Sequence, residues 1–201
     1  LLARWPVPDV MLVAAIIAAG AASIYGRDIV HFYRARRRRE LELNMRIAAL
    51  AFASLGFAVM LPAPLAALAD SETAIAATAY LAVFGWLSGL GLAKLYKIVP
   101  FMTWLECYGP MLGRAPTPRV QDLVSEAKAQ PWFLLYFGSF WAGTAALSVG
   151  SAGGFRVAAA GTLVATFAIA VHLIRARMLS DVDGSQRFPE GTRRPFLLYS
   201  F

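Results

Sequence analysis

The stretch MLVAAIIAAGAASIY, residues 11–25, contains no charged side chain. It belongs to a longer apolar run, residues 7–30, whose charged residues lie near its two ends: Asp9, Arg27 and Asp28. About 20 apolar residues in a helix cross a hydrocarbon layer of about 30 Å, because a helix satisfies its own backbone donors and acceptors in lipid. This stretch therefore predicts a transmembrane helix.

Four further segments have a similar length and character, at residues 47–69, 74–95, 132–149 and 155–174. The last two are joined by the glycine-rich sequence SVGSAGG, which favours a helical hairpin. Strands of a transmembrane barrel are shorter and alternate between polar and apolar residues, whereas these segments are long and continuously apolar. We expect an all-α integral membrane protein, a single bundle of about five transmembrane helices over residues 1–201.

The composition excludes a water-soluble globule. Of 201 residues, 59% are hydrophobic and 15% are charged, and the mean hydropathy is +0.58. A surface dispersed in water carries about 25–35% charged residues, and this chain has too few. One cysteine, Cys107, excludes a disulfide within the chain.

The basic residues predict the orientation. Seventeen of the nineteen Lys and Arg residues lie in three connections on one side of the predicted spans, and only Arg4 and Arg156 lie on the other side. Cytoplasmic flanks hold such an excess. We therefore expect an outward N-terminus, a cytoplasmic loop at residues 97–130 and a cytoplasmic tail at residues 175–201, in a multi-pass protein of the bacterial cytoplasmic membrane. The net charge of +7 then indicates topology rather than a nucleic-acid partner.

The chain begins Leu-Leu-Ala-Arg, without an initiating methionine and without the layout of a signal peptide. We expect that the protein is longer. A further helix upstream of Trp5 would make the number of spans even and bring both termini to the cytoplasm.

A cluster of arginines follows the first predicted span: Arg34, Arg36, Arg37, Arg38 and Arg39. No glycine or proline interrupts this segment, so we expect the helix to continue into it. Each basic residue near an anionic membrane surface contributes about 1 kcal/mol, which predicts anchoring to lipid headgroups. A nucleic-acid or phosphoinositide site is the alternative.

The loop at residues 97–130 has two halves. The first, IVPFMTWLECYGPML, is apolar and aromatic but broken by Pro100 and Gly109-Pro110, so we expect it to lie in the membrane interface with Trp104 and Tyr108 as anchors. In the second half, Thr117-Pro118 resembles a helix start. The apolar positions that follow recur at helical spacing: Val120, Leu123, Val124 and Ala127. They predict a short amphipathic helix on the membrane surface, which covers the bundle or docks a partner.

Glycines in two spans predict close helix packing. Gly85 and Gly89 form a GxxxG motif followed by Gly91, and Gly138 and Gly143 mark a small-residue face in residues 132–149. Glycines one turn apart let another backbone approach. These two faces would meet each other within the bundle or contact another chain.

His31 and His172 are the two histidines of the chain and belong to the first and fifth spans, toward the predicted cytoplasmic side. Two imidazoles from different helices at one depth can ligate a low-spin haem b. Interfacial histidine is the alternative, and we predict no cofactor as the principal interpretation.

The sequence contains no motif that indicates a catalytic site. No ionisable residue lies at the centre of a predicted span, which disfavours a pump or an ion-coupled transporter. No metalloprotease His pair, nucleophile elbow, Walker loop or covalent haem motif occurs. We therefore predict no enzymatic activity.

The segment YLAVFGWLSGLGLAKLYKIVPFMTWLECYGPMLGRAPTPRVQDL, residues 80–123, resembles small bacterial polytopic membrane proteins related to the haem-copper oxidase subunit I superfamily, including the nitric-oxide-response membrane proteins. The resemblance rests on Gly85-Trp86, on Leu95–Phe101 and on the basic run before the second span. It implies a helix-bundle scaffold and an association with electron-transfer complexes. The family's histidines near these motifs are replaced here by Tyr80 and Glu106, so the resemblance implies no haem or copper.

These observations favour a non-catalytic or accessory subunit of a respiratory or photosynthetic membrane complex, with membrane lipids and other transmembrane subunits as partners. One alternative is a haem- or quinone-binding redox protein that uses His31 and His172. The other alternative is a small-molecule or lipid transporter, which would require a discontinuous helix or an inverted repeat. Neither is visible in the sequence.

Overall fold

The computed structural model describes residues 7–35, 41–62, 71–113, 116–187 and 195. Within these residues there are five long helices and no strand, which confirms the all-α prediction. The long helices are α1 (Val7–Ala35), α2 (Leu43–Met60), a continuous helix made of α4, η2 and α5, then α6 (Glu126–Ser148) and α7 (Ala152–Arg177). The short elements are η3 (Gly109–Met111), η4 (Val120–Leu123) and α8 (Gly184–Arg187).

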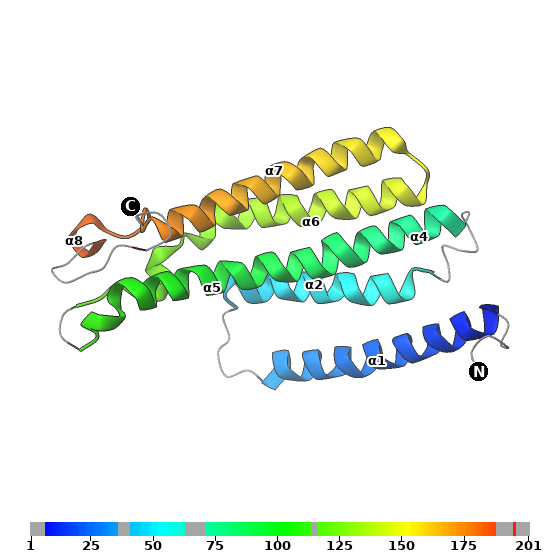
Figure 1. Ribbon diagram of the computed structural model, residues 1–201, viewed down its shortest axis with the longest axis horizontal. Coiled ribbons are helices and arrows are strands. Elements are labelled where there is room, and N and C mark those ends of the chain that lie inside the picture. The colour runs from blue at the N-terminus through cyan, green and yellow to red at the C-terminus, as the bar shows by residue number, and fades with distance from the viewer. Residues whose placement is uncertain (1–6, 36–40, 63–70, 114–115, 188–194, 196–201) are drawn as a thin grey trace.

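Successive long helices run in opposite directions (Figure 1). α6 and α7 pack along their length as a hairpin, and α2 packs against η2 and α5. The hairpin turns at Gly150, whose φ of +67° suits glycine. α1 lies at the edge of the bundle, and its principal contact is with α2.

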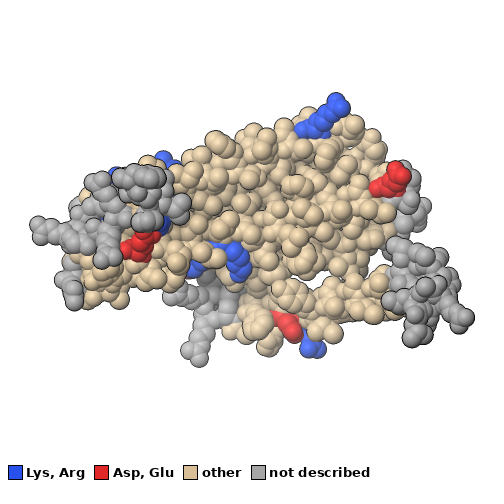
Figure 2. Space-filling view, in the orientation of Figure 1, with Lys and Arg blue, Asp and Glu red and all other residues tan. Residues whose placement is uncertain are grey.

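By length and composition, four helices are able to cross a membrane: Val13–Ala35, Leu43–Met60, Glu72–Met111 and Ala152–Arg177. α6 is the fifth long helix of the described chain but is not among these four. Its Gly, Ser, Thr, Trp and Tyr residues lower its mean hydropathy. On the face shown in Figure 2, charged side chains are few, and the middle of the α6–α7 hairpin is uncharged.

The third predicted span, residues 74–95, is part of a much longer helix. α4 (Ser71–Tyr80) continues through the π-helical segment η2 (Leu81–Ser88) into α5 (Gly89–Tyr108) without a break. Within η2 the backbone N–H of Gly89 donates to the carbonyl of Phe84, five residues earlier. The same carbonyl accepts a hydrogen bond of 2.7 Å from the Tyr136 hydroxyl of α6. A π-turn at this position therefore serves a contact between helices.

The predicted break at Pro100 in residues 98–112 is wrong, whereas the location of this segment in the membrane interface stays a prediction. Proline inside a helix removes one backbone hydrogen bond and costs about 3 kcal/mol, yet α5 continues through it to Tyr108. Tyr96, Pro100, Thr103 and Cys107 are all buried, and their spacing places them on one helix face. Burial of this face against the neighbouring elements offsets the cost of the proline.

The predicted amphipathic surface helix is also wrong. Residues 120–123 form one short 3₁₀ turn, η4, in which the Asp122 carboxylate accepts from the backbone N–H of Arg119 at 2.8 Å. Ala127 belongs to the first turns of α6, which begins at Glu126 rather than at Trp132. The helical spacing of the apolar residues thus comes from two elements in succession. Residues 63–69 of the second predicted span lie outside the described residues.

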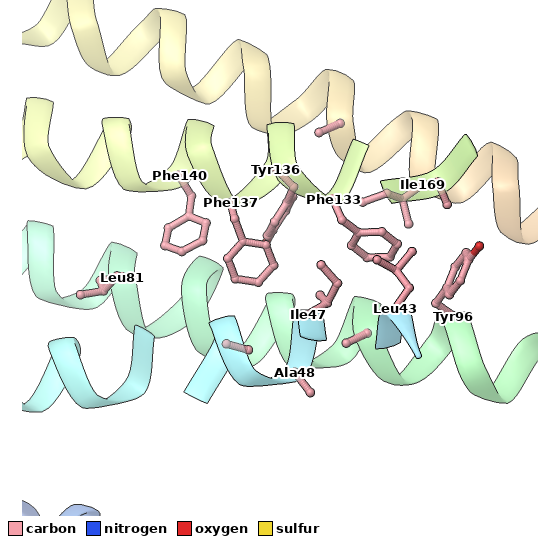
Figure 3. Close-up of a cluster of buried hydrophobic side chains, with 14 of the residues drawn as sticks. Leu43, Ile47, Ala48, Leu81, Tyr96, Phe133, Tyr136, Phe137, Phe140 and Ile169 are labelled. Atoms are coloured by element: carbon pink, nitrogen blue, oxygen red, sulfur yellow. The ribbon is translucent and has the colours of Figure 1, made fainter. Parts of the chain in front are cut away.

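Aromatic side chains of α6 form the core. Phe133, Phe137 and Phe140 point from α6 toward α2 and the α4–η2–α5 helix (Figure 3). The rings of Phe137 and Phe140 stand edge to face with centroids 5.2 Å apart. Leu43 and Ile47 of α2 fill the same layer. Ala165 and Ile169 of α7 belong to the cluster as well, so the centre of the bundle is an apolar cluster from four helices.

Two glycines of the predicted GxxxG motif contact these rings. A Cβ atom on Gly85 would lie 2.7 Å from Cε2 of Phe140 and 2.8 Å from Cβ of Ser54. A Cβ atom on Gly89 would lie 2.9 Å from Cζ of Phe137. All three distances are shorter than normal carbon contacts, so α6 and α2 can approach the long helix only because these positions carry no side chain.

The remaining predicted packing glycines differ from one another. Gly143 of α6 is close to Tyr80, with a Cβ atom there 3.1 Å from Cε1 of that ring. Gly91 and Gly138 face open space. The small-residue faces therefore do not meet each other directly, because aromatic side chains lie between them.

We predict that Gly85→Ala destabilises the protein by about 1–3 kcal/mol, because the added methyl group overpacks the contact with Phe140 and Ser54. Gly91→Ala is the matched control, since it adds the same methyl group in open space six residues further along the same continuous helix. Thermal unfolding of the two variants in detergent measures the difference. Equal unfolding temperatures would contradict the packing role of Gly85.

Candidate functional site

The structure does not bring the two histidines together. His31 is exposed near the end of α1, and His172 is half-buried on α7. α1 packs mainly on α2, whereas α7 packs on α6 and α5, and the two helices lie on opposite sides of the bundle (Figure 1). The described residues also contain no group of three or more His, Cys, Asp or Glu side chains arranged to hold a metal ion.

Ion pairs gather at one end of the bundle, where α2 and α6 begin and α5 and α7 end. We call this group the charged collar: Glu42, Arg46, Lys97, Glu106, Glu126, Lys128, Arg175, Arg177 and Asp181. Its members come from segments that are far apart in the sequence. The collar therefore ties the ends of four helices together.

Glu126 joins the beginnings of α2 and α6. Both of its carboxylate oxygens accept from the backbone N–H of Leu43 at 3.1 Å, and Arg46 lies 3.8 Å away. Leu43 is the first residue of α2, so a negative charge here satisfies an unpaired N–H and complements the helix dipole. Nearby, Glu42 pairs with Lys97 of α5 and accepts from Gln121 at 3.4 Å.

Asp181 joins the end of α7 to the beginning of α6. Its carboxylate lies 2.7 Å from Arg175 and 3.6 Å from Lys128. Burial raises the pKa of this carboxyl, but the hydrogen bond and charge of Arg175 and the charge of Lys128 outweigh burial and hold the pKa below its ordinary value. The ionised form is therefore the one that the folded protein stabilises.

Trp104 and Tyr108, predicted as membrane anchors, make their polar contacts within the protein. The Trp104 indole donates to the carbonyl of Pro118 at 2.6 Å, and the buried Tyr108 hydroxyl donates to the carbonyl of Arg187 at 2.9 Å. Tyr108 packs in a cluster with Cys107, Leu123, Leu179 and Val182. These contacts join α5 to the segments that follow α5 and α7, and the anchoring role of the two rings stays a prediction. The Arg177 guanidinium lies beside this cluster and forms an ion pair with the Glu106 carboxylate at 2.6 Å.

A groove of about 490 Å³ lies between α1 and α2. We call it the α1–α2 groove, and its lining is mostly apolar: Ala22, Tyr25, Gly26, Ile29, Val30, Tyr33, Arg34, Ala49, Phe52, Ala53, Leu55 and Gly56. Figure 2 shows the surface hollowed along the seam between α1 and the rest of the bundle. The groove is the candidate binding site of the described chain.

Two contacts hold the walls of the groove. The rings of Tyr25 and Phe52 meet edge to face with centroids 5.7 Å apart. The Tyr33 hydroxyl donates to the carbonyl of Met45 at 2.6 Å. Arg34, the one predicted anchoring arginine among the described residues, lines the groove at this same end. Arg36, Arg37, Arg38 and Arg39 lie outside the described residues.

The groove has the chemistry of a binding site rather than a reaction centre. Its walls carry aliphatic and aromatic groups, and its polar side chains are two tyrosines and one arginine. Sequence reasoning identified Arg34 but not the groove. The small residues Ala49, Ala53 and Gly56 recur along one side of α2, and this spacing is the signal that could have indicated an open face there.

The lowered pKa of Asp181 predicts a pH-dependent stability. A carboxyl whose pKa is lower in the folded state than its ordinary value of 3.8 stabilises the fold above that value, and this contribution is lost as the pH falls through the folded pKa. We expect Asp181→Asn to lower the unfolding temperature at neutral pH and to lose this difference in acid. Asp183→Asn, at an exposed neighbouring position, is the control. A difference between Asp181→Asn and the unmodified protein that does not change with pH would contradict this assignment.

Comparison with known proteins adds no family. The chain matches no known family model, no curated protein and no solved structure. The resemblance to the haem-copper oxidase subunit I superfamily therefore stays a prediction, and the functional proposal below is argued from the geometry of the bundle.

Proposed function

We propose that this chain is a multi-pass protein of the bacterial cytoplasmic membrane, with its N-terminal side outward and the charged collar in the cytoplasm. Four helices are long and apolar enough to cross a membrane. The alternating helix directions place the ends of α1, α5 and α7 and the beginnings of α2 and α6 on the same side (Figure 1). Described Lys and Arg residues gather at these ends, as the positive-inside rule requires.

The length of the α4–η2–α5 helix indicates where this membrane boundary lies. The apolar segment from Glu72 to Met111 has 40 residues, which at about 1.5 Å per residue greatly exceeds a hydrocarbon layer of about 30 Å. Its first charged residues after the apolar centre are Lys94 and Lys97. The part of α5 beyond them then projects into the cytoplasm, where the charged collar and the Tyr108 cluster surround it.

Within this membrane the chain acts as an accessory subunit that packs against a larger electron-transfer complex. The observation that carries this proposal is the far face of α1. Val13, Ile17 and Ile24 are 46%, 65% and 62% exposed, and helical spacing places them with Gly20 on the side away from the groove. A Cβ atom on Gly20 would meet no atom within 4 Å.

This face suits contact with a second membrane helix. Helices in lipid associate by close packing, and a glycine between β-branched residues lets another backbone approach. α1 makes little contact with its own bundle beyond α2, so it is free to contact a partner subunit.

The orientation is tested by cysteine labelling in intact cells. Gly153 and Asp183 are exposed at opposite ends of the bundle. In a Cys107→Ala background, we expect a membrane-impermeant maleimide to label Gly153→Cys in intact cells and Asp183→Cys only after lysis. The reverse pattern would invert the topology, and labelling of both before lysis would exclude a membrane-spanning bundle.

The accessory role is tested by blue-native electrophoresis of mildly solubilised membranes. We expect the chain to migrate in a larger complex, and Gly20→Leu to shift it toward the monomer because the added side chain blocks the approach of a partner helix. Gly153→Leu places the same side chain in open space at the start of α7 and should leave the complex intact. Migration of the unmodified chain solely as a monomer would refute the role.

A further inference from the structure

The α1–α2 groove is open because both of its walls carry small residues. α1 contributes Ala22 and Gly26, and α2 contributes Ala53 and Gly56. Cβ atoms on Gly26 and on Gly56 would each meet no atom within 4 Å. A volume of about 490 Å³ lies within the range of ligand sites in proteins, which is about 300–1,000 Å³.

The contacts between the walls limit what fits into the groove. The Tyr25 and Phe52 rings meet at 5.7 Å, and the Tyr33 hydroxyl bonds to the backbone of α2. A second transmembrane helix, about 10–12 Å across with its side chains, cannot enter between helices held at these contacts. A flexible hydrocarbon chain can, since it needs only the width of its methylene groups and pairs well with aliphatic walls.

The charge at one end of the groove selects the headgroup. Arg34 lines the groove at the cytoplasmic end of α1, and no acidic side chain of the described residues pairs with it. Arg27, about two turns earlier on the same side of α1, does not line the groove and lies 3.8 Å from Asp28 instead. A guanidinium group beside an apolar slot complements a phosphate on a hydrocarbon chain, because it forms paired charge-assisted hydrogen bonds to phosphate oxygens.

We propose that the α1–α2 groove binds one anionic phospholipid, with an acyl chain between α1 and α2 and the phosphate group on Arg34. The lipid fills the space that the small residues leave and joins α1 to the bundle. This proposal rests on the membrane location proposed above but not on the accessory role, which concerns the opposite face of α1.

The test uses nanodiscs with equimolar phosphatidylcholine and phosphatidylglycerol. The protein is released into mild detergent, and native mass spectrometry measures the lipid that remains bound. We expect one phosphatidylglycerol per chain. Gly56→Leu and Gly26→Leu fill the groove from opposite walls and should abolish retention, whereas Gly20→Leu, on the far face of α1, should leave it unchanged.

The headgroup contact is tested separately. Arg34→Gln keeps a long polar side chain but removes the charge, so we expect the preference for phosphatidylglycerol over phosphatidylcholine to fall about tenfold, the loss of one charge-assisted contact. Arg27→Gln is the matched control and should keep the preference. Circular dichroism confirms that each variant remains helical.

Four outcomes would overturn the proposal: no retained lipid, equal retention of the two lipids, a retained quinone, or a second copy of the chain in place of lipid. Retention that persists in both groove-filling variants would place the lipid elsewhere. Failure of the chain to enter nanodiscs would refute the membrane location itself. A bound lipid on a chain that never joins a larger complex would keep this inference and refute only the accessory role.

Discussion

The contact on which the rest of the bundle depends is the packing of two α6 phenylalanines against two glycines of the long helix. At Gly85 and Gly89, Phe140 and Phe137 of α6 and Ser54 and Ala51 of α2 pack on the same glycine face of the long helix. Apolar burial gives little net attraction between helices in lipid, so close packing must supply it. The π-turn fits the same constraint, because the Phe84 carbonyl accepts from the backbone N–H of Gly89 and also from the Tyr136 hydroxyl of α6. The phenylalanines of α6 and the glycines of the long helix are therefore complementary in shape.

The charged collar completes this arrangement at one end. The core fixes how far apart the helices lie, but it is apolar and does not fix their ends. Glu126 caps α2 from the beginning of α6, and Asp181 binds the end of α7 to the same region. Such pairs contribute little to stability when exposed, but Asp181 is only 10% exposed, and its contacts join segments distant in the sequence. The charged collar thus fixes how the helix ends are aligned with one another, whereas packing in the apolar core supplies the attraction between the helices.

Much of this fold was predictable, and the errors have physical causes. The length of the apolar segments predicted the all-α bundle, because a long apolar segment can pair all its backbone hydrogen-bonding groups only as a helix. The GxxxG spacing indicated where another backbone approaches, but not that rings would fill the contact. Pro100 misled because a proline rule describes an isolated helix, whereas the burial of Tyr96, Thr103 and Cys107 decides the outcome here. Residues 120–127 misled because one periodic pattern spans a 3₁₀ turn and the start of α6.

α1 differs from the other long helices both in its packing and in its ion pairs. It lacks aromatic residues matched to glycines across a helix contact, and it makes no ion pair with the charged collar among the described residues. Its contacts with α2 include one ring contact and one hydrogen bond, from Tyr25 and Tyr33. The glycines of this pair, Gly26 and Gly56, face empty space rather than a ring. The two faces of α1 differ in chemistry: one lines a narrow apolar groove that ends at Arg34, and the other carries exposed β-branched residues around Gly20. The anionic lipid proposed above suits the first face and the proposed partner helix suits the second, so the two proposals concern different sides of the same helix.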